Sequence, residues 1–298
     1  MFNTRKYVSK IANNSETLYS LSEKENIQLK QCLLKMYNDI LEVCIKYKLT
    51  VLLGGGSALG AIRHGGFIPW DDDLDLNMPR EDYNLFIQVF DKELSDKYEI
   101  TTPNSKYQTT HIFTKVYKKN TRLIDMFNSA TDTPKGIFID IFPIENAPKS
   151  KVVRALKGFL SNTVYYIAAS TSLYQQRNQT VEEYFSVSRV GKVNYNIRKI
   201  IGFLASFKSY KEWYNFYDRT FTNSKPSNVY CIPSGRNHYF GEIYSKDVLF
   251  PPRKVKFEGT IAYVPNNVDY YLKNLYGDYM KIPPEDKREK HMIIKFEI

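Results

Sequence analysis

The chain has 298 residues, of which 43% are hydrophobic and 25% charged, and its formal net charge is +10. These values are typical of a soluble globular protein of one or two domains with a sizeable core. No apolar run reaches the roughly 20 residues of a membrane-spanning helix, and the first residues lack the apolar centre of a signal peptide.

The charge is unevenly distributed. Residues 1–148 hold 18 Lys and Arg against 19 Asp and Glu, whereas residues 149–298 hold 24 against 13. A basic surface attracts phosphates of nucleic acid, lipid or another anionic polymer, although it also occurs on ordinary soluble proteins. The charge shift coincides with a change of pattern, which predicts a polar arm (1–22), a first domain (23–148) and a basic, mostly helical region (149–298).

The three cysteines, Cys32, Cys44 and Cys231, show neither metal-ligand spacing nor a disulfide framework. This fits a reducing compartment and predicts a cytoplasmic location. The basic second half is compatible with peripheral contact at the inner face of an anionic membrane.

In the first half, apolar residues recur at helical spacing from Glu23 to Lys48, and Ser22 with Glu25 forms a predicted capping box. A strand at 50–53 leads into a glycine loop, and Ser57 is the predicted N-cap of a short helix. The further elements expected are a helix over 57–63, a strand over 73–78, a helix from Pro79 to about Leu94, and strands near 98–102, 110–117, 121–127 and 136–142.

In the second half the pattern changes to apolar-basic helices, followed by short strands and turns. The helices are expected near 149–172, 180–186, 192–207 and 209–221, with a last short one at 269–275. Pro283 to Arg288 is expected to be a polar loop.

The glycine loop Gly54-Gly55-Gly56 permits positive φ angles and close approach of the backbone to a ligand. The first N–H groups of the next helix would point at an anion. The loop matches neither the Walker A motif nor the Rossmann fingerprint. We therefore expect Gly55, Gly56 and Ser57 to bind the phosphates of a ligand, with Arg63 as a bidentate phosphate contact.

Four acids crowd into Asp71-Asp72-Asp73-Leu74-Asp75. If the run is extended, Asp71, Asp73 and Asp75 share one face, and Asp72 points the other way with Leu74. Carboxylates so close together would repel one another without a cation, and Mg²⁺ or Mn²⁺ takes such ligands together with substrate phosphates. A solvated acidic turn is the simpler alternative.

Asp140 lies within the apolar run Ile137 to Phe142, where an unpaired carboxylate would be costly. A metal or a cationic partner would remove that cost. We expect Asp140 to complete the site as metal ligand or general base, with Asp125 as its substitute. A structural pair with an arginine is the alternative, and His64 is a second candidate base.

These residues carry a family resemblance. The run from Gly55 to Tyr83, with its Gly-Gly-Phe-Ile-Pro-Trp-Asp-Asp-Asp segment, is similar to the LicD family of phosphotransferases, a branch of the nucleotidyltransferase superfamily. Residues 136–144 and several positions between 257 and 283 match as well. The resemblance implies an α/β (α+β) fold, with a nucleotidyltransferase-like mixed sheet flanked by helices and a C-terminal basic helical region.

The resemblance also implies an activity: metal-dependent transfer of a phosphorylated alcohol, commonly phosphocholine, from a CDP-activated donor to a cell-surface glycan such as teichoic acid, lipopolysaccharide or capsule. Asp71, Asp73, Asp75 and Asp140 would bind metal, and Asp73, Asp75 and Asp140 would be catalytic. The candidates for further donor or acceptor contacts are His64, Glu258, Asp278 and His291.

The sequence is also compatible with two other functions. The acids and the loop would equally serve a nucleotidyltransferase that moves the nucleoside monophosphate itself. The basic second half could instead belong to a binding module without enzymatic activity, although no nucleic-acid motif is present and we expect no nucleic-acid partner. Choline, glycerol, ribitol and ethanolamine are all compatible with the sequence as the transferred alcohol, and the acceptor is compatible with a lipid-linked glycan.

Overall fold

The computed structural model describes residues 18–103, 111–186, 188–222, 225–288 and 291–298, so most of the expected N-terminal arm lies outside the described residues. A mixed sheet runs in the order β1-β2-β6-β4-β3, and β7 and β8 continue it beside β6. Its strands are β1 (Leu52–Leu53), β2 (Asp75–Pro79), β3 (Tyr98–Thr101), β4 (Thr114–Lys118), β6 (Phe138–Asn146), β7 (Val229–Cys231) and β8 (Ile243–Ser245).

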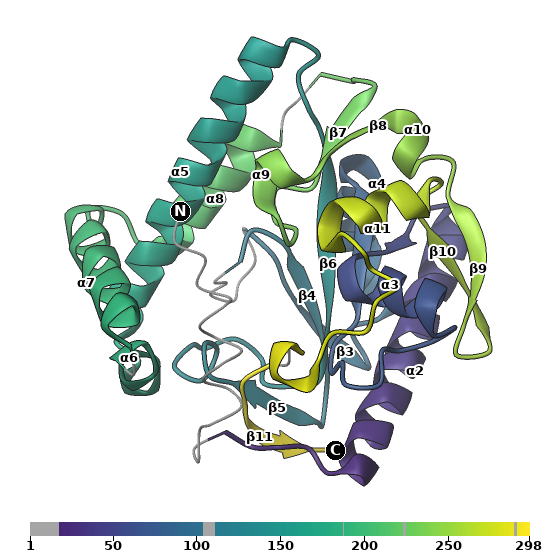
Figure 1. Ribbon diagram of the computed structural model, residues 1–298, viewed down its shortest axis with the longest axis horizontal. Coiled ribbons are helices and arrows are strands. Elements are labelled where there is room, and N and C mark those ends of the chain that lie inside the picture. The colour runs from purple at the N-terminus through teal and green to yellow at the C-terminus, as the bar shows by residue number, and fades with distance from the viewer. Residues whose placement is uncertain (1–17, 104–110, 187, 223–224, 289–290) are drawn as a thin grey trace.

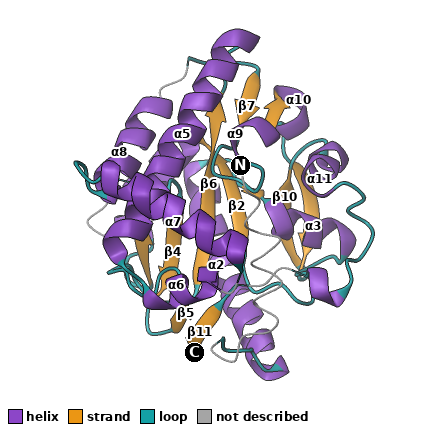
Figure 2. Ribbon diagram, turned by 60° about the vertical axis from the view of Figure 1, so that its left-hand side comes forward, coloured by secondary structure: helices purple, strands orange, loops and turns teal. Residues whose placement is uncertain are grey.

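Helices flank this sheet, as predicted (Figures 1 and 2). One group lies to its left in Figure 1: α5 (Lys151–Gln176), α6 (Gln179–Ser186), α7 (Arg189–Leu204) and α8 (Tyr210–Phe221). The other side carries α2 (Glu23–Tyr47), α3 (Gly55–Arg63), α4 (Arg80–Glu93) and α11 (Val268–Tyr276), and two short helices, α9 (His238–Gly241) and α10 (Lys246–Leu249), lie near β7 and β8. No helix in the described part of the chain is long and apolar enough to cross a bilayer.

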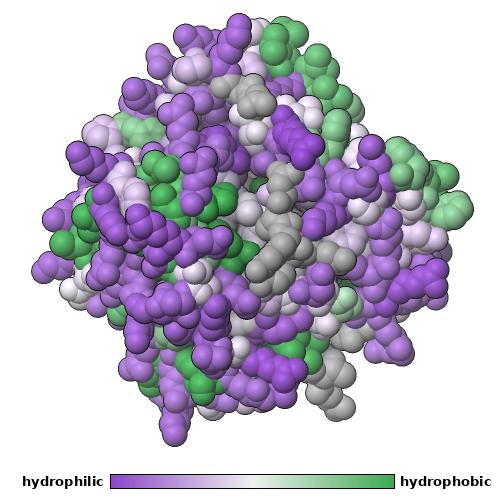
Figure 3. Space-filling model, turned by 180° about the vertical axis from the view of Figure 1, so that it is seen from behind, coloured by the Kyte–Doolittle hydropathy of each residue, from purple (hydrophilic) through white to green (hydrophobic). Residues whose placement is uncertain are grey.

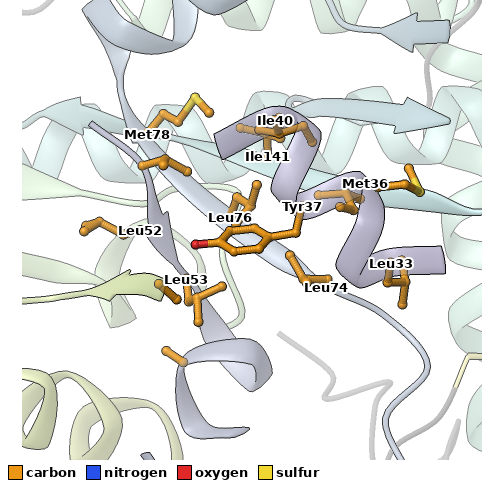
Figure 4. Packing of buried hydrophobic residues seen from close by; sticks show 14 of the residues in the cluster. Leu33, Met36, Tyr37, Ile40, Leu52, Leu53, Leu74, Leu76, Met78 and Ile141 are labelled. Carbon is orange, nitrogen blue, oxygen red and sulfur yellow. The ribbon is translucent and has the colours of Figure 1, made fainter. Parts of the chain in front are cut away.

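Helix α2 confirms the expected capping box. The Ser22 hydroxyl accepts from the Glu25 N–H, and the Glu25 carboxylate accepts from the Ser22 N–H. The buried face of α2 packs on the sheet, and Tyr37 lies among leucines of β1 and β2 (Figure 4). Two apolar residues of its periodic pattern, Ile27 and Ile45, are exposed.

The strands that carry the acids form the centre of the core. β2 and β6 pair in parallel with Asp75 opposite Asp140 and Leu76 opposite Ile141. Leu74, Leu76 and Ile141 are completely buried. This pairing places the start of β2 and the first residues of β6 at one edge of the sheet.

The structure corrects the starts of two expected elements and adds one strand. Helix α3 begins at Gly55 rather than at 57, so Gly54 is its N-cap and Ser57 is not. Strand β2 begins at Asp75 rather than at 73, because residues 71–74 follow a turn closed by the Asp71 N–H and the Ile68 carbonyl. An unexpected strand, β11 (Ile293–Glu297), pairs with β5 (Arg122–Asp125).

The predicted domain boundary near 148 falls between β6 and α5. Strands β7 and β8, from the second half, nevertheless pair with β6 and with each other. The division of the chain into 23–148 and 149–298 therefore stays a prediction about sequence character, because one sheet contains strands from both segments.

A β-hairpin from the second half packs on the first. β9 (Arg253–Phe257) and β10 (Thr260–Val264) are joined by Glu258 and Gly259, which both have positive φ angles. A two-residue turn of this kind suits the twist of the strands and favours glycine at its second position. Phe257 is fully buried against the rings of Tyr37 and Phe67.

This packing makes the hairpin part of the main core. We expect Phe257→Ala to lower the free energy of unfolding by about 3–5 kcal/mol, because it removes a buried ring and leaves a cavity. Chemical denaturation followed by circular dichroism measures this. The control is Ile261→Ala on the partner strand, an exposed side chain whose loss should change the free energy of unfolding by only about 0.5 kcal/mol. Equal losses would show that the hairpin is not anchored through Phe257.

Candidate active site

A cavity of about 570 Å³ opens beside the start of α3 and the acidic run. Residues from both halves of the chain line it. The carboxylates on its wall are Asp71, Asp72, Asp73, Asp75, Glu242 and Asp278, and the cationic side chains are Arg63, Arg236, Lys281, Lys287 and Arg288. The aromatic rings are Trp70, Phe113, Phe142, Tyr165, Tyr271, Tyr276 and Tyr279.

Backbone hydrogen bonds hold the acids against the N-terminus of α3. The Asp75 N–H donates to the Ser57 hydroxyl at 2.8 Å, and the Asp75 carbonyl accepts from the Gly54 N–H at 2.9 Å. Ser57 therefore positions the acidic strand with its side chain, although it does not cap the helix.

The glycines leave room for the carboxylates. A Cβ atom at Gly55 would lie 3.0 Å from an oxygen of Asp75, and one at Gly56 would lie 2.9 Å from an oxygen of Asp71. Gly55 also has a φ of +43°, which favours glycine. Asp71 and Asp75 thus approach the same helix end from two sides.

The first N–H groups of α3 have no acceptor within the helix, and the first helical bond is from the Ala58 N–H to the Gly54 carbonyl. The Gly55 N–H already donates to the Tyr271 hydroxyl at 3.0 Å. Of the three expected phosphate-binding N–H groups, this leaves those of Gly56 and Ser57 for an anion.

Two side chains form hydrogen bonds to the backbone of the loop that precedes the acids. Lys30 of α2 donates to the carbonyls of Ile68 and Pro69, at 3.1 and 2.8 Å. The Glu258 carboxylate accepts from the Phe67 N–H at 2.8 Å. Glu258 does not line the cavity, and its expected contact with a ligand stays a prediction.

Burial and mutual repulsion raise the pKa values of three carboxyl groups in the acidic run. Burial, reinforced by Asp73 and Asp72, raises the pKa of Asp71 well above its ordinary value. Burial raises the pKa of Asp73 to about 6, with His291 opposing the shift and Asp72 adding to it. Burial, Asp73 and Asp140 raise the pKa of Asp75 well above its ordinary range. Negative charge in this cavity is therefore only partly compensated by the protein.

Asp72 lies in the cavity, contrary to the expectation that it points away. Since regular strand geometry begins only at Asp75, alternation does not apply to residues 71–74. Asp72 accepts from the His291 N–H at 3.0 Å and lies 2.8 Å from His291 Nδ1. Burial disfavours the imidazolium form, but Asp72 and Asp73 outweigh it and hold the pKa of His291 well above its usual range.

Asp140 has a cationic partner. Lys115 Nζ contacts its two carboxylate oxygens at 2.7 and 2.9 Å, and Asp140 is not part of the cavity wall. The partner is a lysine from β4 rather than the arginine considered above. Asp125 accepts from the N–H groups of Phe127 and Asn128 in a turn, and it also lies off the cavity wall.

Of the remaining predicted site residues, two line the cavity and one lies outside it. Arg63 and Asp278 line the cavity, and Arg63 donates to the Tyr279 carbonyl at 2.7 Å. His64 does not line it; its ring accepts from Arg63 Nε at 2.9 Å and packs edge-on against Trp70.

Several wall residues escaped sequence analysis. Arg288 lies 4.3 Å over the Trp70 ring and Arg236 lies 4.9 Å over the Tyr276 ring. The two arginines belong to no recognisable motif, and their nearness to the acids depends on tertiary folding. The only available signal was the basic composition of the second half.

A divalent cation fits this donor set only together with a substrate. In the described residues, no three His, Cys, Asp or Glu side chains come together as a ready metal site. Mg²⁺ typically binds one or two carboxylates and takes its other ligands from phosphate and water. Asp71 and Asp75 face one helix end, and their charge is only partly compensated, which matches that pattern.

Known proteins are similar to this chain in sequence. Residues 48–159 match the family model described as the nucleotidyltransferase domain of LicD/FKTN/FKRP. The chain is 29% identical over 269 residues to the lipopolysaccharide cholinephosphotransferase LicD of Haemophilus influenzae, covering 84% of this chain and 89% of that protein. An uncharacterized protein of Rickettsia typhi is 38% identical over 71 residues, 24% of this chain and 22% of its own length.

The matched domain contains the glycine loop, the acidic run and Asp140, and the relationship to the Haemophilus protein extends over most of both chains. The chain is thus similar to the LicD family over residues 48–159 and to the Haemophilus cholinephosphotransferase over most of its length.

Proposed function

We propose that this protein transfers phosphocholine from a CDP-choline donor to a hydroxyl group of a cell-surface glycan. The observation that carries the proposal is the meeting of Asp71, Asp73 and Asp75 with the N-terminus of α3 in one cavity. The fold, the match to the LicD family model and the name of the Haemophilus relative support the transfer of choline phosphate.

The donor diphosphate would bind where positive potential is concentrated. The N–H groups of Gly56 and Ser57 point from the helix end, and Arg63, Arg236 and Arg288 stand on the wall. Mg²⁺ or Mn²⁺ bound by Asp71 and Asp75 would neutralise charge on the diphosphate.

The reaction would be an in-line displacement at the phosphorus that carries choline. The acceptor oxygen forms a bond to this phosphorus, the bond to the oxygen bridging to CMP breaks, and CMP leaves with that oxygen. Asp73 takes the proton of the acceptor hydroxyl, because Asp140 is bound by Lys115 while Asp73 faces the cavity. Positioning of the two substrates and stabilisation of the charge in the transition state would supply most of the rate enhancement.

The aromatic wall suits the choline head group. A quaternary ammonium is attracted to the faces of tyrosine, phenylalanine and tryptophan rings. Phe113 and Phe142 lie 4.4 Å apart between centroids, and Tyr165 stands on the same wall. The acceptor would be a lipopolysaccharide, teichoic acid or capsular glycan, and the reaction would take place in the cytoplasm.

The reaction class is tested by release of CMP from CDP-choline, CDP-glycerol, CDP-ribitol and CDP-ethanolamine, with and without Mg²⁺ or Mn²⁺. We expect metal-dependent release from CDP-choline, and a loss of about 10²–10⁴-fold in Asp73→Asn, because this variant removes the proton acceptor without changing the side-chain shape. Quantitative chromatography of CMP measures both.

The matched control is Asp91→Asn, an exposed acid on α4 that should leave CMP release unchanged. Release of pyrophosphate from a nucleoside triphosphate, with no CMP from any donor, would contradict the proposal and favour a nucleotidyltransferase. Full activity of Asp73→Asn would remove Asp73 from the mechanism.

The negative charge of the acidic run, which the protein compensates only in part, predicts an effect on stability. Without divalent cations at neutral pH, we expect Asp75→Asn to raise the melting temperature by about 2–4 °C, because the raised pKa of Asp75 shows that its ionised form destabilises the folded state. Differential scanning fluorimetry measures this. CDP-choline with Mg²⁺ should raise the melting temperature of the unmodified protein and have less effect on the variant. A lower melting temperature for the variant without cations would contradict the charge argument.

A further inference from the structure

Helix α7 presents its apolar stripe to solvent. Val190, Val193, Ile197, Ile200 and Leu204 follow the spacing of one helix face, and their exposed fractions are 40 to 68%. The residues that α7 buries are Asn194, Tyr195 and Gly202, two of which are small or polar. This is the reverse of the usual arrangement for a surface helix, in which the apolar stripe faces the core.

Helix α5 shows the same reversal in its first half. The apolar residues Val152, Leu156, Phe159 and Leu160 are 46 to 78% exposed. The residues that α5 buries are small or hydroxylated: Gly158, Ser161, Ala168, Ser170, Thr171 and Ser172. Two neighbouring helices therefore both direct large apolar side chains outward.

Close packing between the two helices fixes this orientation. Gly202 of α7 lies directly against the Ser170 carbonyl and Tyr174 of α5, so any side chain there would collide with the backbone. The Tyr174 and Phe203 rings contact edge to face, with centroids 5.8 Å apart. Rotating either helix to bury its apolar stripe would break this contact.

The two apolar stripes lie on one side of the molecule. α5 and α7 are on the left in Figure 1, and Figure 3, seen from behind, shows apolar side chains along its upper and right-hand edges. We call the exposed apolar side chains of these helices, together with Phe207 just beyond α7, the α5–α7 face.

The segment that carries this face is strongly basic. Residues 149–221 contain 12 Lys and Arg against 4 Asp and Glu, a net charge of +8. The basic residues interleaved with the apolar stripes include Lys151, Arg154, Arg189, Lys192 and Lys199. Amphipathic helices with apolar and basic residues bind at the interface of bilayers that contain anionic lipids.

We infer that the α5–α7 face docks this protein on an anionic lipid bilayer, with α5 and α7 lying in the plane of the interface. Complementary charge distinguishes this occupant from a second copy of the chain, because joining two such faces would bring net charges of the same sign together. Burial of the apolar side chains among acyl chains supplies the second contribution to binding.

Docking on this face would bring the cavity close to the lipid surface. Tyr165 on α5 lines the cavity, and Leu160 on the same helix belongs to the apolar face. They lie on different faces of α5, so the thickness of one helix, roughly 10–12 Å with side chains, separates the apolar face from this part of the cavity. A hydroxyl of a lipid-linked glycan held near the interface could thus reach the cavity, but the membrane contact itself does not depend on the proposed transfer reaction.

Flotation of the full-length protein with vesicles tests the inference. We expect it to float with phosphatidylcholine vesicles that contain phosphatidylglycerol, and to float much less with phosphatidylcholine alone or at high salt. The variant Ile200→Ser/Leu204→Ser should lower the partition coefficient by about tenfold, since two apolar side chains no longer enter the bilayer. Circular dichroism and the melting temperature confirm that the variant is folded.

The matched control is Ile27→Ser/Ile45→Ser, which changes two exposed isoleucines of α2, with exposed fractions of 52 and 64%, outside the α5–α7 face. This variant should float like the unmodified protein. Failure of the unmodified protein to float with anionic vesicles, or equal losses in both variants, would overturn the inference. A concentration-dependent dimer that only Ile200→Ser/Leu204→Ser abolishes, without flotation, would assign the face to a second copy instead.

Discussion

The cavity depends on the way Asp75 is held at the start of β2. Its N–H group donates to the Ser57 hydroxyl, its carbonyl accepts from Gly54, and it stands opposite Asp140 on β6. These backbone contacts connect helix α3 to the two central strands. They bring carboxylates and a helix N-terminus together, although the carboxylates repel one another. The fold therefore maintains a concentration of negative charge that a bound cation would relieve.

Local sequence patterns predicted most of the fold. The 3.6-residue periodicity and the Ser22–Glu25 capping box identified α2. Alternation along the acidic segment identified β2, and a continuous apolar run identified β6, each within a few positions. The pairing of β5 with β11 was missed because neither short segment shows it alone, and it forms only when opposite halves of the chain meet. The start of α3 was misplaced because glycine can serve as an N-cap without a side-chain hydrogen bond.

Local sequence patterns also predicted part of the site. Asp71, Asp73 and Asp75 stood out because acids rarely crowd beside an apolar strand, and all three line the cavity. The contact of Asp72 with His291 and that of Asp140 with Lys115 join segments distant in sequence, so spacing contained no information about them. Their chemical roles stay predictions, because geometry places a side chain but does not show which ligand it binds.

The residues that line the cavity lie far apart in the sequence, and this affects when the site forms during biosynthesis. Gly55 and Asp75 come from the first third of the chain, whereas Tyr271 and His291 come from its last residues. Contacts between such distant segments form late, because a long loop must close before they contribute any stability. A ribosome-bound chain would have built the central strands before the residues that complete the cavity emerge. Donor binding would therefore distinguish fully folded molecules from partly folded ones. The residues that face the acids across the cavity come into place only late in folding.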